Sequence, residues 1–247
     1  MTFCVGIKVN EGIVALADTR IVRGSEQSNK QKLSEFKHAG HSLFTMTSGL
    51  RSVRDKTLTY TEEALRNDAP SCQRLYQFVN LFGDQLQRVK TEDGPALAAT
   101  NYSFNLNAII GGRLSEDAEP QMFYVYPEGN WVESNPDAPY FMAGRTYYGK
   151  PILDLLLRRD TSLRSAVALA LLAFDATQAS VTDVGYPIDV AVLANTDATP
   201  HYQRYDEPAL RSTIEQWQAS LNQSVLNLPM DWAAQLFSPN FPGDTSL

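Results

Sequence analysis

The first eighteen residues constrain the fold most, because they predict a β-hairpin that is almost entirely apolar. Large apolar residues alternate with smaller or polar ones at Phe3, Val5, Ile7 and Val9. This period of two is typical of a strand with two unlike faces. Residues 10–12 predict a tight turn, and the apolar run 13–17 predicts a second strand that ends at Asp18. A chain that packs its first residues in this way holds its amino terminus in place.

The rest of the chain predicts helices and strands in separate groups. Strands are expected at 42–47, 104–110, 122–126, 140–143 and 188–193, with a weaker candidate at 131–132. Helices are expected at 50–66, 75–86, 150–158, 163–176 and 207–226. Gly111 and Gly112 are expected to form a turn. Segregated runs of this kind indicate an α+β fold, whereas strict alternation would indicate a parallel doubly wound sheet.

Length and composition favour one globular domain. We expect a single domain over residues 1–247, with a carboxyl-terminal helix at about 207–227 and a loose tail at about 238–247. The net charge of −7 argues against a nucleic-acid partner, since such binding depends on Lys and Arg. No apolar run is long enough for a membrane span, and no signal-peptide pattern is present, so we expect no membrane association.

The cysteine content points to a reducing compartment. The two cysteines, Cys4 and Cys72, are too few for a disulfide framework or a four-cysteine zinc site. We therefore expect a cytoplasmic protein. Cys4, on the first strand, is expected to be a small packed residue.

Thr2 is a candidate nucleophile on condition that Met1 is removed. The Thr2 hydroxyl would then lie beside a free α-amine, whose ordinary pKa of about 7.7 to 8 lets it accept a proton near neutral pH. A nearby lysine would lower the pKa of that amine by charge repulsion. Met-Thr alone is a weak signal, but the hairpin should bring Asp18 back towards Thr2.

Several further segments carry a specific resemblance. They are Gly12–Arg20, which ends in Ala-Asp-Thr-Arg, then Gly24, Lys32-Leu33 and Ser48-Gly49. With Thr2, this set resembles the proteasome β subunits and their bacterial relatives among the amino-terminal nucleophile hydrolases. Segments 148–154, 160–163 and 184–189, together with the long carboxyl-terminal helix, look like the Anbu branch of that family. The resemblance extends from Thr2 to about Trp232.

The resemblance implies a four-layer αββα sandwich of two stacked sheets, with helix pairs on both outer faces. It also implies a homo-oligomer, as a ring or an open helical assembly, that cleaves a peptide or unfolded polypeptide without cofactor or metal. By position, Thr2 would be the nucleophile, Lys32 the cation that tunes it and Asp18 the partner of that lysine. Gly49 would donate the oxyanion hydrogen bond, and Arg20 would brace the site through a buried ion pair.

The match also has departures. The lysine spacing is one residue short, which leaves Lys30 as an alternative to Lys32. The family's supporting serine falls on Ala143, and its later aspartate falls near 181–183 without a clean match. Two alternatives therefore remain: an amidase of the same superfamily that acts on small amides, and a multimeric scaffold or interaction protein that has lost turnover.

Other polar clusters favour structural explanations. His38 and His41 predict a solvated turn and not a metal site. The acidic pairs Glu62-Glu63 and Glu116-Asp117 are expected to lie on solvated faces. Trp217 and Trp232 are expected either in the core or at subunit contacts.

Overall fold

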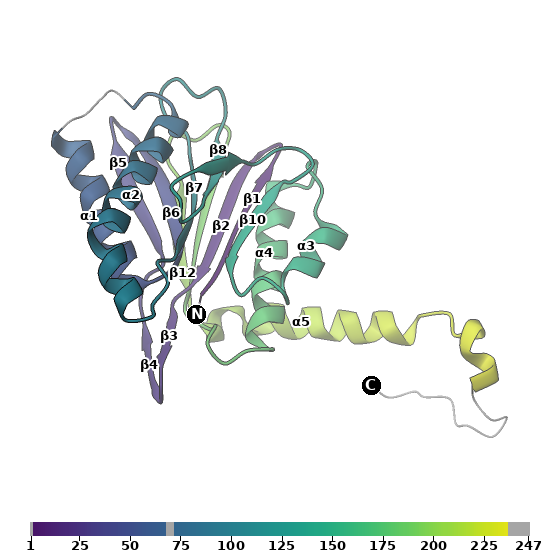
Figure 1. Ribbon diagram of the computed structural model, residues 1–247. Coiled ribbons are helices and arrows are strands. Elements are labelled where there is room, and N and C mark those ends of the chain that lie inside the picture. Colours follow the sequence, from purple (N-terminus) through teal and green to yellow (C-terminus); the bar gives the residue numbers. More distant parts are fainter. Residues whose placement is uncertain (1, 68–71, 237–247) are drawn as a thin grey trace. The chain divides into compact units, whose positions relative to one another are not determined.

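The computed structural model of the chain describes residues 2–67 and 72–236, which fall into two units (Figure 1). The first unit extends to Tyr205, and the second begins at Asp206. Met1 and the expected tail at 238–247 lie outside the described residues. The expectation of a single domain over residues 1–247 stays a prediction.

The first unit contains two five-stranded antiparallel sheets and a separate hairpin. The first sheet has the order β10 (Tyr140–Gly144), β1 (Phe3–Val9), β2 (Gly12–Asp18), β11 (Ile188–Ala194) and β12 (His201–Tyr205). The second sheet has the order β5 (Leu33–His38), β6 (His41–Gly49), β7 (Leu106–Gly112), β8 (Gln121–Val125) and β9 (Trp131–Glu133). The separate hairpin is formed by β3 (Arg20–Arg23) and β4 (Glu26–Asn29).

Two pairs of helices cover the outer faces of these sheets (Figure 1). Helices α1 (Arg51–Asn67) and α2 (Leu75–Ala99) pack on the second sheet. Helix α4 (Leu163–Gln178) packs on β1 and β2, and α3 (Lys150–Leu156) packs on α4. The inner faces meet through contacts of β1 and β10 with β6 and β7. The fold is the expected α+β, four-layer αββα sandwich.

Strand β1 is buried along its whole length, although its alternating sequence predicted two faces of unlike character. Phe3 packs edge-on against Phe174 of α4, whereas Cys4 lies in the apolar cluster between the sheets. A Cβ atom on Gly6 would come within 2.6 Å of the Met122 sulfur on the second sheet. The alternation therefore separates large residues, which face the helices, from small residues, which let the second sheet approach.

Gly111 and Gly112 lie inside β7, so the turn expected there is wrong. Gly111 is paired with Phe44 of β6, and any side chain at Gly111 would overlap the Phe44 ring. Glycine is needed here because a large buried ring occupies the space beside the backbone.

Four strands of the first unit were not expected from the sequence: β3, β4, β5 and β12. All residues of β4 are polar and exposed, so its sequence has no alternation of apolar residues to detect. In β5 the buried residues are Leu33 and Phe36, three positions apart, which is not the period of a strand. These strands form because neighbouring strands pair with them and not because of their own pattern.

The Glu116-Asp117 pair is divided between solvent and core, which corrects the expectation of a solvated face. Asp117 is buried and accepts hydrogen bonds from the backbone N–H groups of Leu75 and Leu114, both at 2.9 Å. Because Leu75 is the first residue of α2, Asp117 caps that helix from a distant loop. Glu116 instead forms an exposed ion pair with Arg74.

We expect Asp117→Ala to destabilise the protein by about 2 kcal/mol, because two buried backbone donors lose their acceptor. The matched control, Glu116→Ala, removes only an exposed ion pair and should change stability by less than about 0.5 kcal/mol. Urea unfolding of both variants measures the difference. Equal effects for the two neighbours would contradict the capping role.

The second unit contains α5 (Glu207–Leu226) and a short 3-10 helix, Asp231–Leu236. The bounds of α5 agree with the expected carboxyl-terminal helix. None of its residues is buried, and Trp232 beyond it is exposed, so the subunit-contact interpretation of this segment stays a prediction. Among the described residues, no helix is both long and apolar enough to cross a membrane.

Candidate functional site

The amino-terminal hairpin brings Thr2 and Asp18 together, as its sequence suggested. Thr2 directly precedes β1, Asp18 ends β2, and the antiparallel register pairs Cys4 with Ala17. The backbone N–H of Phe3 donates to Oδ1 of Asp18 at 2.8 Å. The carboxylate thus binds the backbone of the residue that follows Thr2, at the end of the sheets where the N label lies in Figure 1.

Asp18 and Lys32 form a buried ion pair. The ammonium of Lys32 lies 2.7 Å from Oδ1 of Asp18, and the two side chains are 3% and 0% exposed. Lys32 also donates to the backbone carbonyl of Arg20 at 2.7 Å. Burial raises the pKa of Asp18, and Lys32 together with the Phe3 N–H opposes that rise. Both charges are therefore stabilised by each other and by backbone groups of the protein, and not by water.

Lys32 and not Lys30 faces this carboxylate. Lys30 is exposed, and its backbone N–H donates to the carbonyl of Thr19 at 2.7 Å. The two lysines lie between β4 and β5 and differ in environment although they are two residues apart. The catalytic role of Lys32 stays a prediction, but of the two lysines only Lys32 is paired with Asp18.

Gly49 ends β6 directly before α1 and has a left-handed backbone φ of 148°. A Cβ atom at this position would collide with the backbone of Asn105 and Leu106, so the close pairing of β6 and β7 requires glycine. The next backbone N–H, that of Leu50, donates to the carbonyl of Asn105 at 2.9 Å. The sharp exit from the strand places the Gly49 backbone at a cavity wall.

Thr2, Lys32 and Gly49 all line one cavity of about 850 Å³. Its other walls come from the β3–β4 hairpin, from the end of β6, from the first turn of α1 and from Ser103, Asn105 and Leu106. Three of the four residues predicted for the site thus meet at one cavity, and the fourth, Asp18, lies behind Lys32.

A second set of contacts with the backbone around Thr2 comes from the end of β10. Gly144 pairs with Phe3, and the backbone N–H of Arg145 donates to the Thr2 carbonyl at 2.7 Å. The Arg145 guanidinium binds Asp183 at 2.9 Å. Although burial opposes ionisation of Asp183, the hydrogen bonds from Arg145 hold the pKa of that carboxyl below its usual value.

Sequence reasoning placed a supporting aspartate only somewhere in 181–183 and gave Arg145 no role. Asp183 is the residue of that range that binds Arg145, whose backbone N–H in turn donates to the Thr2 carbonyl. Ala143, where a serine was expected, is buried in the cluster between the sheets. The sequence signal for the Arg145–Asp183 pair was absent, because its members lie 38 residues apart.

Arg20 departs from its expected buried ion pair. Its guanidinium donates to the carbonyls of Thr182 and Val184, both at 3.3 Å, and has no carboxylate partner among residues 2–67 and 72–236. It lies flat against Gly185, where a side chain would overlap it. Arg20 therefore braces the 182–185 loop through its backbone.

Cys4 is a packed residue, as expected, and the two histidines border a turn. The Cys4 thiol is fully buried, and burial together with the Asp18 charge raises its pKa far above the ordinary value, so it is a packing residue. His38 and His41 flank the turn between β5 and β6. The part of the chain that the structure describes contains no cluster of three or more His, Cys, Asp or Glu side chains suited to a metal ion.

Comparison with protein families matches residues 2–193 to the family described as "Proteasome subunit". Among curated proteins, the chain is 27% identical over 203 residues to "Proteasome subunit beta 1" of Pyrobaculum neutrophilum, which covers 80% of this chain and 92% of that protein. "Proteasome subunit beta 2" of Pyrobaculum islandicum is also 27% identical, over 199 residues, with 78% and 90% covered.

Solved structures of Anbu proteins share the fold. The "Helical Assembly of the Anbu Complex" from Pseudomonas aeruginosa superposes with a TM-score of 0.84 at 29% identity, over 92% of this chain and 97% of that one. "Anbu (ancestral beta-subunit)" from Yersinia bercovieri gives a TM-score of 0.81 at 26% identity, over 92% and 97%.

Proposed function

Because the chain belongs to the proteasome subunit family, as an Anbu-like member, we propose that it is a threonine hydrolase that cleaves peptide or amide bonds. The nucleophile is the Thr2 hydroxyl, exposed as the terminal residue once Met1 has been removed. The observation that supports this most is the meeting of Thr2, Lys32 and Gly49 at one cavity, with Asp18 bound to Lys32.

The first step is attack of the Thr2 hydroxyl on the substrate carbonyl. The α-amine of Thr2 takes the hydroxyl proton and later passes it to the leaving amine. Lys32 lies in the same cavity and is held by Asp18, so its positive charge lowers the pKa of that amine by repulsion. This keeps a larger share of the amine neutral and able to accept the proton.

The negative oxygen that forms on attack needs a hydrogen-bond donor, and the backbone N–H of Gly49 is the candidate. Gly49 directly precedes Leu50 and the first residue of α1, where backbone donors and the helix dipole favour negative charge. Collapse of this intermediate leaves an ester between the acyl group and Thr2. Water then hydrolyses the ester and restores the free hydroxyl.

We further propose that the protein acts as a cytoplasmic homo-oligomer on peptides or unfolded polypeptides. The helical assembly of the Pseudomonas aeruginosa relative supports an oligomer, and the free thiols of Cys4 and Cys72 are suited to a reducing compartment. A scaffold without turnover is the second candidate, and the observation that favours it is Ala143 in place of the supporting serine.

Intact mass before and after incubation with a peptide epoxyketone tests the hydrolase. We expect the purified chain to lack Met1 and to gain the mass of one probe. Thr2→Ala should lose the adduct and keep its thermal melting temperature, because Thr2 contributes a small side chain at the end of a strand. The control Thr59→Ala, on the exposed side of α1, should label like the parent. A chain that keeps Met1 and takes up no probe would favour the scaffold.

A further inference from the structure

The cavity at Thr2 extends onto the start of α1, where two arginines line it. Helix α1 begins two residues after Gly49, and Arg51 and Arg54 lie three residues apart on it, so they share one face. Both belong to the same cavity wall as Gly49 and Leu50. A substrate side chain that enters this cavity from Thr2 therefore meets guanidinium groups.

Of the two arginines in the cavity wall, Arg54 is the buried one. The residue is 9% exposed, and its Nε and Nη2 donate to Oδ1 of Asp55 at 2.8 and 2.5 Å. Its Nη1 has no hydrogen-bond partner within residues 2–67 and 72–236. A mostly buried guanidinium whose unbonded nitrogen keeps some access to solvent favours a further anionic partner.

The carboxylate beside Arg54 is already shared. Asp55 also accepts from Nε of Arg51 at 3.3 Å, so one negative charge faces two positive ones. Burial works against ionisation of Asp55, but hydrogen bonds from Arg54 and Arg51 lower its pKa, so it is charged at neutral pH. The arginine pair therefore keeps one uncompensated positive charge at the cavity wall.

The other charged groups of the cavity do not cancel this charge at Arg54. Lys32 is paired with Asp18. Glu26, the one described carboxylate in the lining, lies at the exposed turn of the β3–β4 hairpin. An exposed carboxylate is screened by water, whereas the charge of Arg54, whose side chain is 11% exposed, is screened much less.

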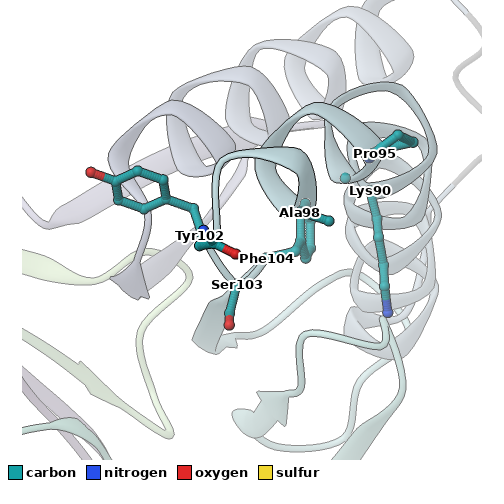
Figure 2. A pocket seen from close by; sticks show the side chains of 8 residues that line it. Lys90, Pro95, Ala98, Tyr102, Ser103 and Phe104 are labelled. Carbon is teal, nitrogen blue, oxygen red and sulfur yellow. The ribbon is translucent and has the colours of Figure 1, made fainter.

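A second cavity of about 600 Å³ adjoins the first at Ser103, which lines both. Figure 2 shows it beside the end of α2, with Lys90 and Tyr102 on opposite sides of the segment that joins α2 to β7. The ammonium of Lys90 lies 5.9 Å from the centre of the Phe104 ring, and the described lining contains no carboxylate. The positive character therefore continues beyond the cavity at Thr2, in a chain of net charge −7.

Building on the proposed hydrolase, we propose that the cavity selects substrates with an acidic side chain next to the bond that is cleaved. A glutamate carboxylate enters beside Thr2 and pairs with Arg54, which acts as the specificity-determining residue. The planar guanidinium is suited to a carboxylate because it offers parallel N–H donors. Arg51 and Lys90 add an attractive field for acidic peptides.

The test uses peptide epoxyketones that are identical except for the side chain next to the reactive group: Glu, Gln, Leu or Lys. Rates of covalent labelling are followed by intact mass on the processed full-length chain. We expect the Glu probe to react at least about tenfold faster than the Gln probe, which has the same shape without the charge. We also expect this ratio to fall as salt is added.

The variant Arg54→Met should bring the Glu to Gln ratio close to one, and Arg54→Lys should keep part of it. Because a ratio within one variant cancels any loss of folded protein, partial destabilisation does not obscure the result. Arg66→Met is the matched control, since Arg66 lies on the same helix with a 73% exposed side chain and outside this cavity. It should leave the ratio unchanged.

A substitution at a different residue, the carboxylate bound to Arg54, provides a further test. Asp55→Asn removes the carboxylate that competes for both arginines and should raise the Glu to Gln ratio. Equal rates for Glu and Gln in the parent chain, or faster labelling by Leu, would overturn the acidic selectivity and leave the hydrolase standing. Absence of labelling by all four probes would instead overturn the hydrolase itself.

Discussion

The variant Lys32→Met is expected to lose both its reactivity and much of its stability. Methionine has nearly the length of lysine but no charge, so it leaves Asp18 buried without its cationic partner. Removal of one member of a buried ion pair costs about 3 to 5 kcal/mol. Labelling of Thr2 should slow by about 100-fold or more, because the α-amine loses the charge that tunes it.

The pH dependence of Lys32→Met distinguishes a buried charge from a simple packing defect. Burial already raises the pKa of Asp18, and loss of Lys32 raises it further. A carboxyl whose pKa is higher in the folded protein than the unfolded value of about 3.9 binds protons preferentially in the folded state. The folded variant therefore loses stability as the pH rises from the unfolded pKa of Asp18 to its raised pKa in the folded protein. The destabilisation relative to the parent is largest at neutral pH.

Denaturant unfolding of parent and Lys32→Met at about pH 5 and about pH 7.5 measures this difference. The matched control is Lys37→Met, because the Lys37 side chain is 79% exposed and only loosely paired with Glu35 at 3.8 Å. Lys37→Met should stay within about 0.5 kcal/mol of the parent at both pH values. A destabilisation of Lys32→Met that is independent of pH would contradict the charge interpretation.

Gly144→Ala is expected to displace the nucleophile. A Cβ atom at Gly144 would overlap the Thr2 carbonyl, which is also the acceptor of the Arg145 N–H. The backbone of Thr2 must shift away from β10, and a shift of about 1 Å can cost about 100-fold in rate. We expect labelling by the epoxyketone to fall by at least that factor.

The control for Gly144→Ala separates backbone strain from the collision with Thr2. Gly144 and Gly40 have similar left-handed φ values, 89° and 81°, but a Cβ atom on Gly40 would have nothing within 4 Å. Gly40→Ala therefore has the strain alone, about 1 to 2 kcal/mol, and should keep full labelling. Comparable loss of labelling in both variants would show that strain, and not the position of Thr2, is the cause.

The predictable part of the fold came from segments whose apolar residues repeat with a regular period. Strand β1 and the helices α2 and α5 begin where such patterns indicated them, although α2 continues to Ala99, beyond the expected end at residue 86. The β3–β4 hairpin, which forms one wall of the cavity, has no such pattern because β4 is polar and exposed throughout. The turn predicted at Gly111 was wrong because glycine usually marks a turn, whereas here the Phe44 ring, which is distant in sequence, requires a glycine inside a strand.

The sequence by itself determined that Thr2 lies next to Asp18, because a tight hairpin leaves its two ends no other register. It also left Lys30 and Lys32 as the two candidates for the lysine of the site, and it placed Gly49 at the end of a strand. Only the tertiary structure decided that Lys32 pairs with Asp18, that Arg145 and Asp183 hold Thr2 from the other side, and that Arg54 lines the cavity. Contacts between distant segments depend on how the layers stack, and local periodicity carries no information about that stacking.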